Sequence, residues 1–551
     1  MEVKNGRIFA HFMRRIGEFL QSTYAPWLFA AVLAVCAAVL AVWFGGLNQD
    51  EGWYLYAAQM VRAGKLPYRD FFYTQGPTMP FVYAVLAPVW GMSSPLHGLL
   101  GGRVVTLALG FLATFCAVAL VRWLVPPNRR PLAGFAVFAL LGGNLYHLYF
   151  TAIPKTYALG SLFLLGGLLL IAHGICGGVR RGAGPALLLA AGGFSLACAT
   201  GTRISLLLIL PVVGCVLLVR FRAFRWGFLW FGLGGVAGLA LTYGFFACDP
   251  ASLRGLLAAQ NYHAARGGFD PFFALGSVSR LARGYAALGV VLFAGCALWM
   301  RREGGNVSAG EAYGDGQRAV LWMLGLGFAA VFLLQLSAPF PYDDYQVPIM
   351  GMLTVLIVAG FARRAAAPRA AMWFVTLAAG LVSFTSPMLQ EWAIYGQDRF
   401  WSQKKEMTEL AKLRLVGREL QALDPQGTTL LTQDLYLAVE TGRTVPPGLE
   451  MGPFSYFPEM KTEEARAVHV LNRELMTQLL ASAPCTAAAA SGYGFAIAAP
   501  TCVQVPFEEQ TRFFELLKTH YELRSTEPNF GQNATTLLVL TRRDAQKGTK
   551  E

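Results

Sequence analysis

Eleven segments of the chain are apolar enough and long enough to cross a membrane as helices. A membrane-spanning helix needs about 20 largely apolar residues. The segments that meet this need are 25–44, 103–124, 131–150, 156–176, 184–201, 204–220, 228–247, 283–300, 318–337, 346–362 and 371–387. Only 14% of the 551 residues are charged, whereas a soluble domain usually carries about a quarter. The sequence therefore predicts a polytopic α-helical membrane protein.

Positive charges are concentrated in the short loops between these segments. Such loops usually lie on the cytoplasmic side, and the clusters here are Arg122/Arg129/Arg130, Arg180/Arg181, Arg220/Arg222/Arg225, Arg301/Arg302 and Arg363/Arg364/Arg369. All five clusters fall on one side if a further apolar, proline-containing stretch, 78–97, does not cross. We therefore expect eleven spans, an uncleaved first span, a cytoplasmic N-terminus and an extracytoplasmic C-terminus. This distribution also explains the net charge of +13 without nucleic acid as a partner.

The same orientation places most chemically capable side chains on the outer side. The cytoplasmic loops contain little beyond Arg, Gly and Pro, whereas the outer loops carry carboxylates, tyrosines, a histidine and a few cations. These candidate site residues are Asp50, Glu51, Arg69, Asp70, Tyr73, Gln75, Lys155, Arg203, His263, Arg266, Asp343, Asp344 and Tyr345. The working face of the protein is therefore expected outside.

The first outer loop, 45–102, begins with a predicted amphipathic helix. Asp50 stands where a helix could start, Gly64 ends it, and the residues that recur between them at helical spacing are Trp53, Tyr56, Ala57 and Met60. Trp and Tyr suit the membrane interface, so we expect this helix to lie on the membrane. Its two carboxylates have a simpler interpretation too: Asp50 could cap the helix, and Glu51 could complement its dipole.

A motif follows this helix, and with it the loop resembles a known family. The acidic pair Asp50-Glu51 directly after the first span, followed by Gly64-Lys-Leu-Pro-Tyr-Arg-Asp-Phe-Phe-Tyr-Thr-Gln-Gly-Pro77, is similar to the GT-C superfamily of membrane glycosyltransferases. The likeness is to the bacterial branch related to aminoarabinose-lipid A transferases and protein O-mannosyltransferases (family 39/83-like). That family has a large outer loop after its seventh span. The spans predicted from hydropathy alone also leave a long outer loop after the seventh span, at 249–282.

The resemblance implies transfer of a sugar from a polyprenyl-phosphate donor at the outer face of the bacterial cytoplasmic membrane. Its acceptor would be a lipid, a glycan or a protein. By position in the motif, Asp50 would be the general base of an inverting reaction, with Glu51 supporting it or contacting the acceptor. Candidate ligands of the donor phosphate are Lys155, Arg203, His263 and Arg266. Lys155 could instead extend to the membrane surface, and Arg103, at the start of a span, is expected to be an interfacial anchor.

The remaining polar candidates have both functional and structural interpretations. Asp343 and Asp344 could bind acceptor hydroxyls, could hold a divalent cation with Asp50, or could cap the helix that follows. Asp70 could pair with Arg69 or touch substrate. A divalent metal is therefore a possible cofactor, although the sequence contains no zinc spacing, Walker loop or nucleophile elbow.

Residues 388–551 are predicted to form an extracytoplasmic α/β domain beyond the membrane module 1–387. Helices are expected at 400–422, Leu435–Thr441, 461–482 and 507–520, and strands at Thr428–Thr432, Phe495–Ala499, Val503–Val505 and Thr535–Thr541. Cys485 and Cys502 flank a hairpin-like stretch, and outside the cytoplasm they are expected to form a disulfide. The stretch 445–458 could lie over the membrane cavity.

Two other function classes compete with the glycosyltransferase. A transporter or lipid flippase without chemistry would show repeated halves and interrupted helices at matching positions, and no such halves are visible. A family member reduced to a binding subunit would not need the intact Asp50-Glu51 pair. The one-sided carboxylates and the appended domain favour the enzyme.

Overall fold

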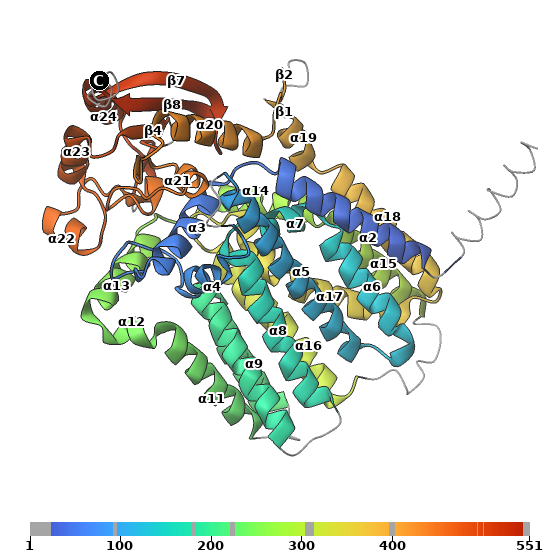
Figure 1. Ribbon diagram of the computed structural model, residues 1–551. Coiled ribbons are helices and arrows are strands. Elements are labelled where there is room, and N and C mark those ends of the chain that lie inside the picture. Colours follow the sequence, from blue (N-terminus) through green and yellow to red (C-terminus); the bar gives the residue numbers. More distant parts are fainter. Residues whose placement is uncertain are drawn as a thin grey trace, which may run out of the picture.

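The chain is a helical bundle with a smaller α/β domain stacked on one end (Figure 1). The structure is a computed structural model that describes residue 22 and residues 24–91, 96–177, 183–220, 226–302, 313–395, 403–492, 494–499 and 501–543. The C-terminal domain lies over the end of the bundle that carries the first loop (Figure 1).

Each predicted span coincides with one or more apolar helices of the bundle. Among the described residues, eight helices are long and apolar enough to cross a membrane, two bent pairs also pass, and Ile204–Val219 is a shorter apolar helix. The helices are α2 (Ala25–Val39), α5 (Gly98–Leu124), α6 (Arg130–Gly142), α7 (Leu145–Ala152), α8 (Thr156–Cys176), α9 (Ala183–Thr202), α10 (Ile209–Arg220), α11 (Gly227–Leu239), α12 (Phe245–Cys248), α14 (Pro271–Gly284), α15 (Ala286–Arg302), α16 (Asp315–Leu336), α17 (Val347–Arg364), α18 (Pro368–Phe384) and α19 (Pro387–Ala393). The predicted polytopic helical fold is confirmed.

One predicted span is broken, and the break shapes the site. Residues 131–150 do not form one helix, because α6 ends at Gly142 and α7 starts afresh at Leu145, bent by 66°. Asn144 causes the restart, since its side chain accepts a hydrogen bond from the backbone N–H of His147 at 3.1 Å, as a helix cap does. The stretch 78–97 contains only the nine-residue helix α4 (Thr78–Leu86) among its described residues, which is too short to cross.

The two ends of α5 mark the two ends of the bundle, one at the C-terminal domain and the other at the arginine clusters. Its N-terminal end meets the C-terminal domain, where Glu440 accepts a hydrogen bond from the N–H of Leu99 at 3.0 Å. Its C-terminal end lies at the arginine clusters, where Arg363 donates to the carbonyl of Leu124 at 2.9 Å and Arg129 donates to that of Ala365 at 2.6 Å. A helix of 27 residues separates these ends by about 40 Å at 1.5 Å per residue. Two of the clusters predicted to share one side therefore lie together, and those at 180–181 and 222–225 lie outside the described residues.

The helix of the first loop is present, but its surroundings differ from the prediction. It is α3 (Gln49–Arg62), and its aromatic residues Trp53, Tyr54 and Tyr56 are all at least 96% buried. They belong to the same apolar core as residues of the C-terminal domain, including those of α21 (Leu435–Thr441). The expectation that α3 lies on the membrane surface is wrong, because an apolar helix face can be covered by protein as well as by lipid.

The C-terminal domain is built on a four-stranded sheet with the order β3-β4-β8-β7. Only the pair β3–β4 is parallel, and the other neighbours are antiparallel. Two small antiparallel pairs, β1–β2 and β5–β6, lie outside this sheet, and the connection after α12 carries one more helix, α13. These elements are α13 (Pro250–Ala264), β1 (Ile394–Tyr395), β2 (Gln403–Lys404), α20 (Glu409–Leu423), β3 (Leu430–Leu431), α22 (Thr462–Ala467), α23 (Arg473–Ser482), β4 (Ala487–Ser491), β5 (Ile497–Ala498), β6 (Val503–Gln504), α24 (Phe507–His520), β7 (Tyr521–Phe530) and β8 (Thr535–Arg542).

The structure corrects several predictions for this domain. The predicted helix 461–482 is two helices, separated at His469, whose φ of 59° no helix allows. Strand β4 was not predicted, because its alanine run lacks β-branched residues, and β7 was missed as well. The predicted helix 400–422 begins only at Glu409, and residues 400–402 lie outside the described part.

The predicted disulfide is also wrong. Neither Cys485 nor Cys502 is part of a disulfide. Cys485 is buried just before β4, in the main sheet, and its carbonyl accepts from the hydroxyl of Tyr521. Cys502 lies in the turn between β5 and β6 and faces Tyr262 of α13, with Sγ 3.6 Å from the hydroxyl. The two thiols are separated because the stretch between them does not fold as one hairpin.

Gly52 makes the packing of α3 on the C-terminal domain testable. A Cβ at this position would overlap the backbone nitrogen of Tyr436 and lie 2.8 Å from the carbonyl carbon of Leu435. We expect Gly52→Ala to lower the midpoint of thermal unfolding, although Ala normally stabilises a helix by about 1 kcal/mol relative to Gly. The control is Gly232→Ala in α11, where a Cβ meets nothing within 4 Å. An unchanged midpoint for Gly52→Ala would contradict this close packing.

Candidate functional site

Asn48, rather than Asp50, caps the helix that carries the acidic pair. The Asn48 side chain accepts a hydrogen bond from the N–H of Asp50 at 3.1 Å, and the Glu51 carboxylate accepts one from the N–H of Asn48 at 2.9 Å. This reciprocal arrangement is a capping box. The capping role considered for Asp50 therefore belongs to its neighbours, and the carboxylate of Asp50 is left for other contacts.

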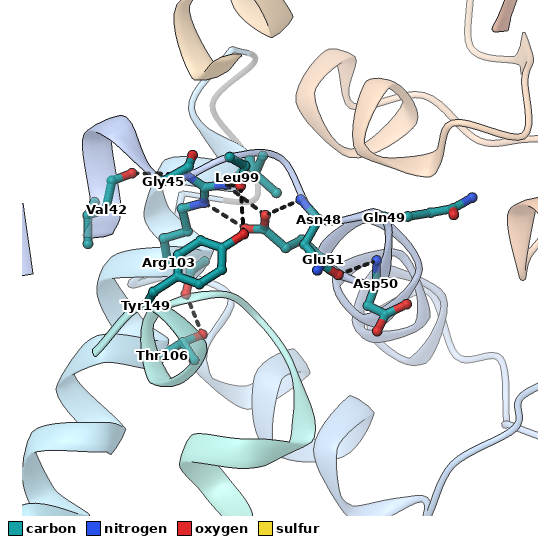
Figure 2. Close-up of polar contacts among 12 residues, drawn as sticks. Val42, Gly45, Asn48, Gln49, Asp50, Glu51, Leu99, Arg103, Thr106 and Tyr149 are labelled. Atoms are coloured by element: carbon teal, nitrogen blue, oxygen red, sulfur yellow. Dashed lines mark hydrogen bonds and ion pairs between the residues drawn. The ribbon is translucent and has the colours of Figure 1, made fainter. Parts of the chain in front are cut away.

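Glu51 is held in a buried ion pair with Arg103 (Figure 2). Arg103 Nε and Nη2 donate to the two carboxylate oxygens at 2.6 and 2.7 Å, and both side chains are fully buried. The guanidinium also donates to three carbonyls that end the first span, those of Val42, Gly45 and Gly46, at 2.9–3.0 Å. Arg103 is therefore a structural cation and not the interfacial anchor expected from its position. Glu51 fixes α3 to α5 and the first span.

Asp50 projects to a different side of the first turn of α3 from Glu51 (Figure 2). Its side chain is 31% exposed, whereas that of Glu51 is not exposed at all. Oδ1 accepts from the indole N–H of Trp53 at 3.1 Å, and Oδ2 lies 2.9 Å from the ammonium of Lys155. Of the two adjacent carboxylates, Asp50 alone can meet a molecule that enters the site.

Lys155 joins Asp50 to Asp344, although 189 residues separate the lysine from the second aspartate. Its Nζ lies 3.0 Å from Asp344 Oδ2, which also accepts from the hydroxyl of Tyr157 at 2.9 Å. Burial lowers the pKa of Lys155, but Asp344 and Asp50 outweigh that effect, so its net pKa is raised well above the usual value. The ammonium stays charged at neutral pH. It is directed at carboxylates and does not extend to a membrane surface.

Arg203 lies next to this cluster with its guanidinium against aromatic rings. Its Cζ is 4.6 Å from the ring centroid of Tyr345 and 5.1 Å from that of Tyr157. Its Nε is buried without a hydrogen-bond partner in the described part of the chain. An unpartnered buried donor is costly, so Arg203 has capacity for an acidic ligand.

Arg266 is a second cation of the same kind, from the end of α13. Its Cζ lies 5.5 Å from the rings of both Tyr262 and Phe340, and its Nε likewise has no hydrogen-bond partner within the described residues. Tyr345 interacts electrostatically with both Arg203 and Arg266. Two guanidinium groups therefore converge on one tyrosine.

His263 and Asp343, which lies just before α17, have mainly local partners. His263 Nε2 lies 2.6 Å from the carbonyl of Thr74, and burial lowers its pKa to about 4, so the ring is neutral and donates to that carbonyl. Asp343 accepts from Tyr146 at 2.6 Å and pairs with Arg280 at 2.9 Å. The structure therefore places His263 as a link between α13 and the first loop, and Asp343 within its own ion pair.

The motif residues 64–77 form scaffold around α3. Arg69 and Asp70 pair with each other at 3.3 Å, and Asp70 also accepts from the N–H of Leu66 at 2.8 Å. Tyr73 is fully buried against Trp53 and Tyr54, and the carbonyl of Gln75 accepts from Tyr68. None of these contacts brings the four predicted substrate ligands of this motif to Asp50.

Several residues of the site were missed by the sequence reasoning. Trp53, Tyr157, Tyr146 and Arg280 all contact predicted site carboxylates. Arg280 lies on α14, within the predicted large loop 249–282, and Tyr157 follows Lys155 by two residues. The position of Arg280 in that loop could have signalled it. Tyr146 and Tyr157 lie within predicted spans, and the carboxylates that they contact are distant in sequence.

The carboxylates of the site do not form a metal-binding group. Among the described residues, no three His, Cys, Asp or Glu side chains are grouped so that they could hold a metal ion. Asp50 and Asp344 approach the same point, but the Lys155 ammonium lies between them. The donors present therefore do not fit the divalent cation considered from the sequence.

Solved structures with the same fold are known. ArnT from Cupriavidus metallidurans matches in the apo state with a TM-score of 0.58 and 12% identity. Bound to undecaprenyl phosphate it matches with a TM-score of 0.57 and 11% identity, and each match covers 94% of this chain and 98% of that one. An Archaeoglobus fulgidus oligosaccharyltransferase tethered with an acceptor peptide has a TM-score of 0.50 at 11% identity, covering 93% of this chain and 74% of that one. No protein-family model and no curated sequence matches. The chain has the GT-C fold.

Neutralising Glu51 should lower the free energy of unfolding far more than neutralising Asp50. We expect Glu51→Gln to lower the free energy of unfolding by about 3–5 kcal/mol, because it leaves the buried Arg103 charge without its partner. Asp50→Asn should change it by less than about 1 kcal/mol, because this side chain is partly exposed and Lys155 keeps Asp344. Thermal unfolding of the purified protein in detergent measures both. Equal losses for the two variants would contradict the assignment of Glu51 as the structural member.

Proposed function

We propose that the chain is an inverting glycosyltransferase that moves a sugar from a polyprenyl-phosphate donor to an acceptor hydroxyl. The observation that carries the proposal is one accessible carboxylate, Asp50, in the same site as Arg203 and Arg266, two guanidinium groups that share Tyr345 and whose Nε donors have no partner among the described residues. The GT-C fold supports it, as does the undecaprenyl phosphate in the ArnT match. The acceptor belongs to the class of lipids, glycans or proteins.

Asp50 acts as the general base in this reaction. Its carboxylate takes the proton of the acceptor hydroxyl while the acceptor oxygen forms a bond to the anomeric carbon. The bond from that carbon to the phosphate oxygen breaks, and its electron pair stays on the phosphate. Attack from the face opposite the leaving phosphate inverts the anomeric carbon. The products are the glycosylated acceptor, polyprenyl phosphate and the proton on Asp50.

Arg203 and Arg266 stabilise the charge that develops on the leaving phosphate. Guanidinium groups bind phosphate through paired N–H donors. The aromatic rings of Tyr157, Tyr262 and Tyr345 hold these groups in place before a donor arrives. Donors that are oriented in advance lower the barrier because they need no rearrangement during the reaction.

We infer from the arginine clusters that this site lies on the extracytoplasmic side of the membrane. Arg129 and Arg363 lie at the far end of the bundle from α3, which supports the proposal under the positive-inside rule. The C-terminal domain would then be extracytoplasmic as well, beside the site.

Replacement of the base should slow transfer strongly while the protein stays folded. We expect Asp50→Asn to reduce the rate by about 10²–10⁴-fold, the usual contribution of a positioned base. The measurement is formation of free polyprenyl phosphate from a panel of polyprenyl-phosphate hexoses and pentoses in membrane vesicles. The control is Asp315→Asn, an exposed aspartate paired only with Arg318 among the described residues. Undiminished transfer in Asp50→Asn would reject Asp50 as the base.

Removal of Arg203, the cation proposed to bind the donor phosphate, should specifically impair use of the donor. We expect Arg203→Leu to lower kcat/KM for the donor by about 10²-fold, the effect of removing one charge-stabilising donor. Arg203→Lys should restore only part of it, because an ammonium lacks the paired donors. Arg254→Leu, an exposed arginine of α13, controls for loss of general positive charge. If Arg254→Leu lost as much, Arg203 would have no specific role.

A further inference from the structure

Lys155 is the cation that allows two carboxylates to meet in the site. Asp50 comes from the start of α3, and Asp344 comes from the 3-10 turn Asp343–Gln346 that leads into α17. Two carboxylates directed at one point repel each other unless a positive charge lies between them. Here that charge is the Lys155 ammonium, at 2.9 Å from one and 3.0 Å from the other, with only 6% of its side chain exposed.

A divalent cation could not share this position with the ammonium. Mg²⁺ and Ca²⁺ bind carboxylate oxygens at about 2.0–2.6 Å and need several oxygen ligands. Lys155 Nζ already uses the facing oxygens, Asp50 Oδ2 and Asp344 Oδ2. A metal ion there would meet a like charge at contact distance.

The other nearby carboxylates are also neutralised by side chains of this chain. Glu51 pairs with Arg103, and Asp343 pairs with Arg280. Each carboxylate around the site thus has a permanent cationic partner. Among the described carboxylates around the site, sharing occurs at Lys155, where one positive charge serves both Asp50 and Asp344. These three groups together carry one net negative charge, next to the Arg203 guanidinium. That remaining charge suits a proton acceptor.

We propose that Lys155 takes the place of a divalent cation in this site, so that the protein works without a metal ion and becomes able to bind one when the lysine is removed. Only the measurements of transfer depend on the proposed function, and the measurements of Mn²⁺ binding do not. Lys155 is a positioning residue, because it touches Asp50 and Asp344 and not the reacting atoms. The proton of the acceptor still goes to Asp50, and the electron pair of the broken bond stays on the phosphate.

The first test uses the unaltered protein. Electron paramagnetic resonance of Mn²⁺ titrated into the purified full-length protein should show only free ion. Transfer, measured as release of polyprenyl phosphate, should be unchanged by EDTA and by added Mn²⁺ or Mg²⁺. Bound Mn²⁺ that disappears in Asp344→Ala, or activity that is lost in EDTA and regained with metal, would overturn the proposal.

The second test removes the lysine. We expect Lys155→Ala to bind Mn²⁺ and the double variant Lys155→Ala/Asp344→Ala to lose that binding. Lys155→Ala should also reduce transfer by about 10²-fold, the scale of a base displaced by about 1 Å, and Mn²⁺ should restore part of it. Lys65→Ala, an exposed lysine of the first loop, is the matched control. Lys155→Met keeps the bulk of the side chain if the smaller variant does not fold.

The two proposals fail in different ways. If no donor is turned over by any variant, the glycosyltransferase proposal fails, but Mn²⁺ binding still reports on the role of Lys155. If transfer occurs and folded Lys155→Ala and Lys155→Met both bind no Mn²⁺, the carboxylates do not form a latent cation site and the inference on Lys155 is rejected.

Discussion

The buried pair between Glu51 and Arg103 determines how the first loop is attached to the bundle. One guanidinium joins a carboxylate of α3 to three carbonyls at the end of the first span, from within α5. Removing two charges from water is costly and is offset only when their hydrogen bonds are complete. They are complete here, since the second carboxylate oxygen also receives the N–H of Asn48. The pair therefore specifies one orientation of α3, and with it the direction in which Asp50 projects.

Adjacent acidic residues on a helix point to different sides, about 100° apart, and this chain uses that separation. Glu51 faces the bundle and is fully buried, whereas Asp50 faces Lys155 and keeps an accessible edge. The same sequence pair thus supplies a structural contact and an accessible carboxylate. In the proposed reaction, a base held in position by its neighbour's ion pair needs little reorganisation when a substrate arrives.

The sequence predicted properties that depend on local pattern and could not predict those that depend on distant partners. Hydropathy located the apolar helices, eight of which are long enough to cross a membrane among the described residues. The arginine clusters predicted that Asp50, Lys155, Arg203 and Asp344 share one side, and the structure brings these four residues together. The ion pairs could not be predicted, because their partners are distant in sequence: Arg103 lies 52 residues from Glu51, and Lys155 lies 189 residues from Asp344. The burial of α3 was missed for the same reason, because the domain that covers it lies almost 400 residues further along the chain. Periodicity identifies an apolar face but not what covers it.

The C-terminal domain contributes to the site through α3 rather than through residues of its own at Asp50. Gln532, in the turn between β7 and β8, accepts from the N–H of Gln49 at 2.9 Å, and the hydroxyl of Tyr56 accepts from the N–H of Val445 at 2.9 Å. The helix is therefore held from the bundle side by Arg103 and from the other side by the domain. The domain therefore fixes the position of Asp50 through the helix that carries it, by contacts at Gln49 and Tyr56.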